Sequence, residues 1–346
     1  MGVTVSTSAR PGPAALRRGP AALSLAVSVC LVLLALALFA SVMFGSKQTP
    51  AADVLRVVTG GGDEYLRTVV ESRYPRTVLG VLAGLCLAVA GTLMQGVTRN
   101  PLAEPGILGI NAGASAGVVS ATAFLGVSGQ RDTVWWALAG ALVTGVAVYA
   151  IGTAGGGSSP VRLVLAGAVL SAVLGAYIQG VALSRPRVFD TYRYWVVGAL
   201  GGRGFDAAWS VLPFAVAGLL LALVLAPGLN AMAMGDDKAA SLGVSPVRIK
   251  GAGLLAATLL SAAATAAVGP IAFVGLAVPH VVRMVVGADF RLQIAFSALV
   301  GPSLLLLADV VGRVLLRPEE LMVGVVTAFV GAPALLLAVR RMRGPA

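Results

Sequence analysis

The chain has 346 residues, of which 58% are hydrophobic and 11% are charged, whereas a soluble domain usually carries about 25% charged residues. This composition excludes an ordinary soluble domain and indicates an integral membrane protein. The net charge of +11 does not indicate a nucleic-acid partner, because the basic residues lie between apolar runs, as membrane-flanking residues do.

The N-terminal region combines a polar tail with the first apolar run. Residues 1–20 are rich in Pro, Gly and Arg, which predicts a disordered tail. The run 19–46 is much longer than the ~7–15 residue core of a signal peptide, so we interpret it as a span that stays in the mature chain. Residues 21–346 are predicted to form one transmembrane domain.

Charge-free runs mark the predicted spans, each of which needs about 20 residues. The run 251–282 is too long for one span, and Pro270 divides it, because proline cannot continue the hydrogen-bond ladder of a helix. A second helix then runs from Ile271 to about Gly287. The sequence predicts an all-α, polytopic transmembrane helical bundle of about ten spans, from the runs 19–46, 77–98, 105–130, 133–161, 163–184, 207–235, 251–282, 292–308 and 321–339.

An even number of spans places both termini on the same side of the membrane. A count of basic residues does not decide which side, because many of them fall in the two longer loops, 47–76 and 185–206, where acids accompany them. The arginine clusters at the chain ends lie close to spans and are uncompensated. They favour a cytoplasmic location for both termini.

A compact polar turn, residues 99–105, joins the second and third spans and contains Asn100, Pro101 and Glu104. A weak echo of this turn appears at residues 269–270 and 279–280. Two inverted halves of about five helices each would produce such an echo. Small residues recur within the runs, and we expect them to let the helices pack closely inside one bundle.

His280 is the only histidine, and it follows Pro279 inside an apolar run. We interpret both residues as a structural polar turn, like Asn100, Pro101 and Glu104, in which His280 satisfies backbone groups that the proline frees. Substrate binding by His280 is the alternative.

The sequence contains few of the residue groupings that catalysis or metal binding requires. The sequence has no cluster of Cys, His and carboxylates at metal-ligand spacing and no Walker motif, so no catalytic site, metal or cofactor is expected. Cys30 and Cys86 lie in apolar runs and are predicted to be buried. Four of the predicted spans contain no acid, which argues against an ion-coupled secondary carrier, the alternative from another class.

The segment 234–250 is the main polar stretch on the predicted cytoplasmic side. Asp236 and Asp237 suit the N-terminus of a helix, whose dipole favours negative charge, and Gly243 suits its C-terminal stop. A short helix within about 236–243 is therefore predicted. A plain solvated connector is the alternative.

Four segments together resemble the FecCD family, the permeases of bacterial ABC importers for iron-siderophores, haem and cobalamin. The resemblance covers nearly the whole chain after Thr68, although Pro270 and Met322 depart from the residues most common in the family. The segments are SRYPRTVLGVLAGLCLAVAGTLMQGVTRNPLAEPGILGINAGASAG from Ser72, GPIAFVGLAVPHVVR from Gly269, LLLADVVGR from Leu305 and EELMVGVVTAFVGAP from Glu319.

The resemblance implies a permease subunit in a bacterial cell membrane that performs no bond chemistry, so the chain is not expected to be an enzyme. It implies a second permease subunit, two cytoplasmic ABC ATPases that supply the energy, and an extracytoplasmic substrate-binding protein. Homodimer and heterodimer stay open. The implied cargo is a ferric siderophore, with haem or cobalamin as the alternatives.

The resemblance also implies three sets of functional positions. Docking of the binding protein falls on Arg73, Arg76 and Arg313. Coupling to the ATPase falls on Asp237, Ala239, Ala240, Leu242 and Gly243, with the alanines and Leu242 as the packing face. A cytoplasmic gate falls on Ser159, Pro160 and Val161, where Pro160 and Val161 replace the family's usual hydroxyl residues and suggest a stiffer, more apolar constriction; an ordinary flexible loop is the alternative.

Overall fold

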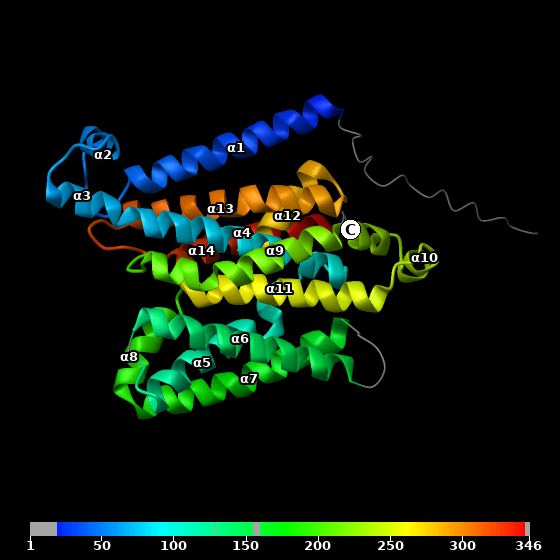
Figure 1. Ribbon diagram of the computed structural model, residues 1–346. Helices are drawn as coiled ribbons and strands as arrows, with labels where there is room; N and C mark the ends of the chain where they lie inside the picture. Colours follow the sequence, from blue (N-terminus) through cyan, green and yellow to red (C-terminus); the bar gives the residue numbers. More distant parts are fainter. Residues whose placement is uncertain (1–18, 128, 155–159, 343–346) are drawn as a thin grey trace, which may run out of the picture.

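The computed structural model describes residues 19–127, 129–154 and 160–342. Most of the predicted tail 1–20 therefore lies outside the described residues, as do residues 155–159. In the described part of the chain, every regular element is a helix (Figure 1). The helices are α1 (Pro20–Met43), α2 (Ala51–Val58), α3 (Glu64–Glu71), α4 (Arg73–Thr98), the 3-10 helix η1 (Pro105–Leu108), α5 (Ile110–Phe124), α6 (Gln130–Thr153), α7 (Pro160–Ser184), α8 (Pro186–Trp195), α9 (Phe205–Ala233), α10 (Asp236–Ser241), α11 (Pro246–Val268), α12 (Val274–Val286), α13 (Phe290–Leu315) and α14 (Val323–Met342).

The prediction of an all-α, polytopic membrane bundle is confirmed. Seven helical stretches in the described residues are long and apolar enough to cross a membrane, and they contain α1, α4, α6, α7, α9, α11 and α13. Three shorter apolar helices, α5, α12 and the first part of α14, occupy the remaining predicted runs.

The bundle has two ends, which we name after the short helices that lie there (Figure 1). At the α8 end, Arg313 near the end of α13 donates hydrogen bonds to the carbonyls of Ser41 and Phe44 at the end of α1. At the same end, the amide of Gly324 in α14 donates to Gly198. Because α1 ends and α14 begins at the α8 end, the first and last helices have their outer termini at the opposite, α10 end.

Three details of the predicted fold are wrong. The loops 47–76 and 185–206 contain the helices α2, α3 and α8. These helices were not predicted because they are short and lie among polar residues. The run 105–130 does not form one span: Gly109 takes a left-handed conformation with φ 72, which separates η1 from a helix of only 15 residues. The helix α4 begins at Arg73, one turn before the charge-free run.

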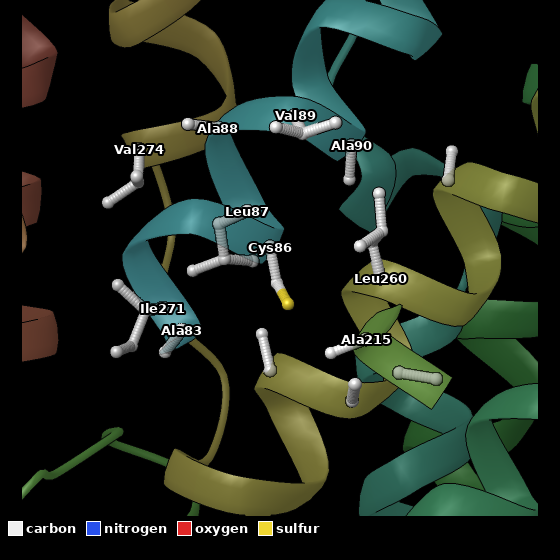
Figure 2. Packing of buried hydrophobic residues seen from close by; sticks show 14 of the residues in the cluster. Ala83, Cys86, Leu87, Ala88, Val89, Ala90, Ala215, Leu260, Ile271 and Val274 are labelled. Carbon is white, nitrogen blue, oxygen red and sulfur yellow. The ribbon is translucent and has the colours of Figure 1, made fainter. Parts of the chain in front are cut away.

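α4 lies in the centre of the bundle, and small residues bring its neighbours close. A Cβ atom on Gly91 would lie 1.8 Å from the carbonyl oxygen of Gly275 in α12, and one on Gly84 would lie 2.6 Å from that of Gly301 in α13. Such close backbone approach is how helices associate where the lipid supplies no hydrophobic drive. Figure 2 shows apolar residues of α4, including Cys86, packed with residues of other segments such as Ala215 and Leu260. Cys30 and Cys86 are both buried free thiols, as predicted.

Candidate functional site

The short helix α10 projects at one end of the bundle, between α9 and α11 (Figure 1). Two glycines set its limits. Gly235 precedes it with φ 113, and Gly243 follows it with φ 78, a left-handed conformation in which a side chain would be strained. After Gly243, the amide of Val244 donates back to the carbonyl of Ala239 over 3.0 Å, and α11 begins two residues later. The helix is thus held in a compact turn.

Asp236, the first residue of α10, ties this helix to the bundle. Its carboxylate pairs with Arg99 at the C-terminus of α4 and, over 2.7 Å, with Lys250 of α11. Arg99 also donates to the carbonyl of Met232 in α9 over 2.6 Å. The hydrogen bond from Lys250, together with the charges of Lys250 and Arg99, lowers the pKa of Asp236. We call Asp236, Arg99 and Lys250 the α10 anchor, because their contacts join α10 to the long helices α4, α9 and α11.

The predicted coupling residues divide into two faces. Ala239 is completely buried against its own chain, so it belongs to the inner face of α10 and not to an outward packing face. Asp237, Ala240, Leu242 and Gly243 are exposed. Met234 and Val247, which flank α10 in the sequence, are also exposed. The exposed apolar residues of this segment are therefore Ala240 and Leu242, with Met234 and Val247 before and after them in the sequence.

The structure describes only part of the predicted gate. Ser159 falls outside the described residues. Pro160 is the first residue of α7, and Val161 follows it with 66% of its surface exposed. The end of α6 and the start of α7 lie toward the α10 end of the bundle (Figure 1).

At the α8 end, one buried acid joins two of the three predicted docking arginines, Arg76 and Arg313. Asp309 of α13 pairs with Arg76 over 2.8 Å and with Arg313 over 2.9 Å. Arg76 also pairs with Glu320 over 2.8 Å. Burial raises the pKa of Glu320, but the charge and hydrogen bond of Arg76 outweigh it, so that pKa lies below its ordinary value. We call Arg73, Arg76, Arg313, Asp309 and Glu320 the arginine cluster.

The arginine cluster serves the fold. Arg313 is 1% exposed and holds the end of α1 through the carbonyls of Ser41 and Phe44. Arg73 is also buried and donates to the carbonyls of Val42 and Met43 over 2.8 and 2.9 Å. The sequence did not indicate these internal contacts. All three arginines still reach the wall of a cavity of about 370 Å³, together with Lys47, Arg203 and Glu320.

One predicted polar turn, at Asn100, Pro101 and Glu104, reaches the start of α12. The side chain of Asn100 accepts from the amide of Leu102 over 3.0 Å and stabilises the bend before Pro101. Glu104 accepts from the amide of Phe273 over 2.9 Å, at the N-terminus of α12. Phe273 has φ 70, which is unusual for a residue with a side chain. Glu104 therefore connects the two places where the helix ladder breaks.

Pro279 is buried in the middle of α12, and His280 beside it is partly buried. Among the residues that the structure describes, no three His, Cys, Asp or Glu side chains are grouped so that they could hold a metal ion. The polar groups that are brought together are thus ion pairs and helix-end contacts.

The comparison with known proteins decides the family. The FecCD transport family matches residues 33–341. The chain belongs to this family. It is 46% identical over 321 residues to the ferric enterobactin transport system permease protein FepD of Escherichia coli (strain K12). The matched region covers 92% of this chain and 96% of the relative. It is 38% identical over 283 residues to the cobalamin import system permease protein BtuC of Halobacterium salinarum, covering 81% and 75%.

The fold of this FecCD permease is also that of a solved structure, described as a metal-chelate type ABC transporter in an inward-facing conformation. The TM-score is 0.80 at 24% identity, and the match covers 92% of this chain and 99% of that chain. The chain is accordingly an ABC importer permease and not an enzyme. Membership of this family decides against an ion-coupled secondary carrier.

Proposed function

We propose that the chain is the permease subunit that carries a ferric siderophore across a bacterial cell membrane. The observation that carries the proposal is the 46% identity to a ferric enterobactin permease along 92% of the chain. A cobalamin permease is also similar, at 38% identity over a smaller share of the chain. Cobalamin is therefore the second candidate cargo, and haem stays an alternative from the family as a whole.

The proposed complex contains a second permease subunit, two ATPases and an extracytoplasmic binding protein. The ATPases dock at the α10 end, which then faces the cytoplasm together with both chain termini. The binding protein docks at the α8 end. A stripe of exposed apolar residues along α7, four residues apart, supports a face available to the second subunit or to lipid: Val161, Leu165, Val169 and Val173.

The proposed two inverted halves are supported by a repeated pattern of elements. In each case a long helix is followed by a break and a short helix: α4 precedes η1 and α5, and α11 precedes the non-helical residues 269–273 and α12. The two breaks touch through Glu104 and Phe273. Inverted repeats place such broken helices at matching positions.

Docking of the binding protein by Arg73, Arg76 and Arg313 stays a prediction. These arginines line the cavity of about 370 Å³, which limits the partner groups that can reach them. Because Arg73 and Arg313 are buried, only a partner side chain that enters this cavity can reach them. A carboxylate would fit, since its bidentate pairing with a guanidinium is favourable. The gate at Ser159, Pro160 and Val161 also stays a prediction.

The α10 anchor suggests how the ATPase moves the spans. A partner that holds Ala240 and Leu242 displaces α10, and Asp236 passes this displacement to α4 and α11 through its contacts with Arg99 and Lys250. Ala240→Trp should therefore abolish import while the permease still inserts and assembles, because the bulky ring prevents close docking. Ala240→Ser keeps the residue small and should import like the wild type. Normal import by Ala240→Trp would place the ATPase contact elsewhere.

The cargo is tested by uptake into bacteria whose own siderophore, haem and cobalamin permeases are deleted, complemented with this chain and its ATPase and binding protein. Radioactive iron supplied as a ferric catecholate siderophore should accumulate, and a variant of the ATPase that cannot hydrolyse ATP should stop it. Uptake of cobalamin or haem without uptake of the ferric chelate would overturn the siderophore assignment.

A further inference from the structure

An apolar cavity of about 250 Å³ lies between the second half of α6 and the first half of α11. It is smaller than the usual site for a small molecule. Among the lining residues that the structure describes, only Tyr149 and Thr258 carry a polar side-chain group, and none is charged. Leu108, Leu163 and Leu254 are its buried lining residues. Such a cavity suits a hydrocarbon chain better than a bulky polar cargo.

Two close contacts show how the cavity runs along the bundle. The hydroxyl of Tyr149 lies 2.8 Å from the point that a Cβ atom on Gly251 would occupy, and Thr258 lies 2.5 Å from that point on Gly145. Because α6 ends and α11 begins at the α10 end, Tyr149 marks the outer end of the cavity and Thr258 its inner end. Thr258 follows Arg248 by ten residues, or about 15 Å along the helix axis. One leaflet of the hydrocarbon core, half of about 30 Å, has the same depth.

The opening of the cavity is an apolar surface. Val146 of α6 and Leu255 of α11 both line it and are 62% and 49% exposed. Leu163, the lining residue from α7, is buried, whereas the exposed stripe of α7 that begins at Val161 lies on another face of that helix. The cavity therefore opens between α6 and α11 and not through the α7 stripe, as expected for an opening that faces lipid.

Two arginines flank the outer end of the cavity. Arg248 is exposed and lies on the same face of α11 as Leu255, seven residues before it, and its side chain leans toward the α10 end. Arg162 precedes Leu163, and its Nη1 donates to the carbonyl of Ala154 at the end of α6 over 2.9 Å. Long basic side chains at span ends reach the headgroup level, where they attract anionic lipids. The charge of the outer end thus complements a phosphate above an apolar space.

We propose that this cavity binds one anionic phospholipid from the leaflet on the α10 side. An acyl chain fills the space between Tyr149 and Thr258, and Arg248 and Arg162 bind the phosphate of the headgroup. The ring of Tyr149 lies where the chain meets the headgroup, a level at which tyrosine is enriched. The bound lipid holds α6 against the first half of α11, the helix that follows α10. The inference goes beyond the proposed function, because it requires neither a particular cargo nor a partner protein.

Native mass spectrometry of the purified full-length protein in detergent tests the headgroup. The probes are dioleoyl phosphatidylglycerol, which is anionic, and dioleoyl phosphatidylcholine, which has the same chains and no net charge. The wild type should bind one phosphatidylglycerol per chain more tightly than phosphatidylcholine. Arg248→Gln should weaken phosphatidylglycerol binding about fivefold, since one basic residue near the anionic headgroup is lost, and should leave phosphatidylcholine binding unchanged.

Matched variants separate this site from general charge and from folding. Arg248→Lys keeps the charge and should bind like the wild type. Arg291→Gln removes an exposed arginine at the same end of the bundle, on α13, which does not line the cavity, and should have no effect. Ala252→Phe fills the cavity and should weaken phosphatidylglycerol binding more than Arg248→Gln does. Val146→Trp, at the exposed opening, replaces it if Ala252→Phe does not elute as one sharp peak in gel filtration.

A phosphatidylglycerol with a photoreactive diazirine in one acyl chain tests the place of binding. After illumination the label should be found in the peptides that contain Val146 and Leu255, and Ala252→Phe should remove it. Label spread evenly over the exposed faces of α1 and α9 would overturn the proposal, because the contacts would then be those of a general lipid layer.

Three other results would also overturn the lipid site. They are equal affinity for the two lipids, equal weakening by Arg248→Gln and Arg291→Gln, and a disulfide between two copies of Leu255→Cys, which would show that a second copy of the chain covers the opening. None of these measurements uses a cargo. The lipid site can therefore fail while the siderophore function stands, and it can hold if the importer takes up no ferric chelate.

Discussion

The two ends of the bundle use the same chemistry at different depths. In the arginine cluster, Asp309 and Arg313 are each 1% exposed. In the α10 anchor, Asp236 and Arg99 are each 41% exposed. Removing one partner of a buried ion pair strongly destabilises the folded protein, whereas an exposed ion pair contributes little to its stability. The comparison indicates that the α8 end is fixed and that the contacts of α10 can be remade at low cost.

This difference suits the proposed roles of the two ends. A docking surface for a binding protein needs a constant shape, and the arginine cluster joins α1, α4 and α13 into one unit. A helix that transmits motion needs contacts that bind but also release. The α10 anchor meets that need because water can replace its partners. The predictions below test the comparison, from the largest expected effect to the smallest.

Removal of the buried acid should have the largest effect. Asp309→Asn leaves Arg313 buried without a negative partner, and we expect the free energy of unfolding in detergent to fall by about 3–5 kcal/mol. Glu320→Gln is the matched control, because it removes the other, 35% exposed partner of Arg76 and should cost less than about 1 kcal/mol. Denaturant titration followed by tryptophan fluorescence measures both. Equal losses would mean that burial does not distinguish the two acids.

A contact without any charge sharpens the comparison. Gly91→Ala puts a methyl group against the backbone of Gly275, which no side-chain rotation can relieve, so α4 and α12 must separate. We expect a loss of about 1–3 kcal/mol by the same titration, together with reduced import. Gly180→Ala in α7 is the control, because nothing lies within 4 Å of the new Cβ, and it should be neutral or slightly stabilising. A neutral Gly91→Ala would show that the helices are less tightly packed than the distances indicate.

The sequence was sufficient for the fold class and for the position of the α10 helix. Membrane spans are visible because each must be apolar over its whole length, a constraint that acts locally along the chain. The limits of α10 were visible for a similar reason: Asp236 and Gly243 act through the backbone of their own helix. Such local signals need no knowledge of the partner helices.

The contacts between distant segments could not be predicted in this way. The arginines looked like surface groups because the spans were defined by the absence of charge, and Asp309 lay just outside a predicted run. Its spacing of four residues from Arg313 on one helix was the available signal. The contact of Glu104 with Phe273 joins residues 169 positions apart, and no local pattern encodes it. The family likewise indicated Ala239 without showing which way it faces.

The smallest effect is expected at the α10 anchor. Asp236→Asn should lower the free energy of unfolding by less than about 1 kcal/mol at neutral pH, because the carboxylate is 41% exposed and water replaces its partners. The same variant should nevertheless reduce ATP-driven import in vesicles, since α10 loses its connection to α4 and α11. Lys238→Gln is the control. It changes an exposed neighbour in the same helix and should leave both import and stability unchanged.

The pH dependence decides whether the ion pair causes this small effect. Lys250 and Arg99 lower the pKa of Asp236 in the folded protein, below the value of about 3.9 of an unfolded chain. The contribution to stability is therefore present above that unfolded value and is lost as the pH falls through the lowered folded pKa. The difference in melting temperature between wild type and Asp236→Asn should be small but measurable at pH 7 and should disappear in strong acid. A difference that persists in acid would mean that the charge of Asp236 does not hold α10, and that the two ends of the bundle differ in something other than the burial of their ion pairs.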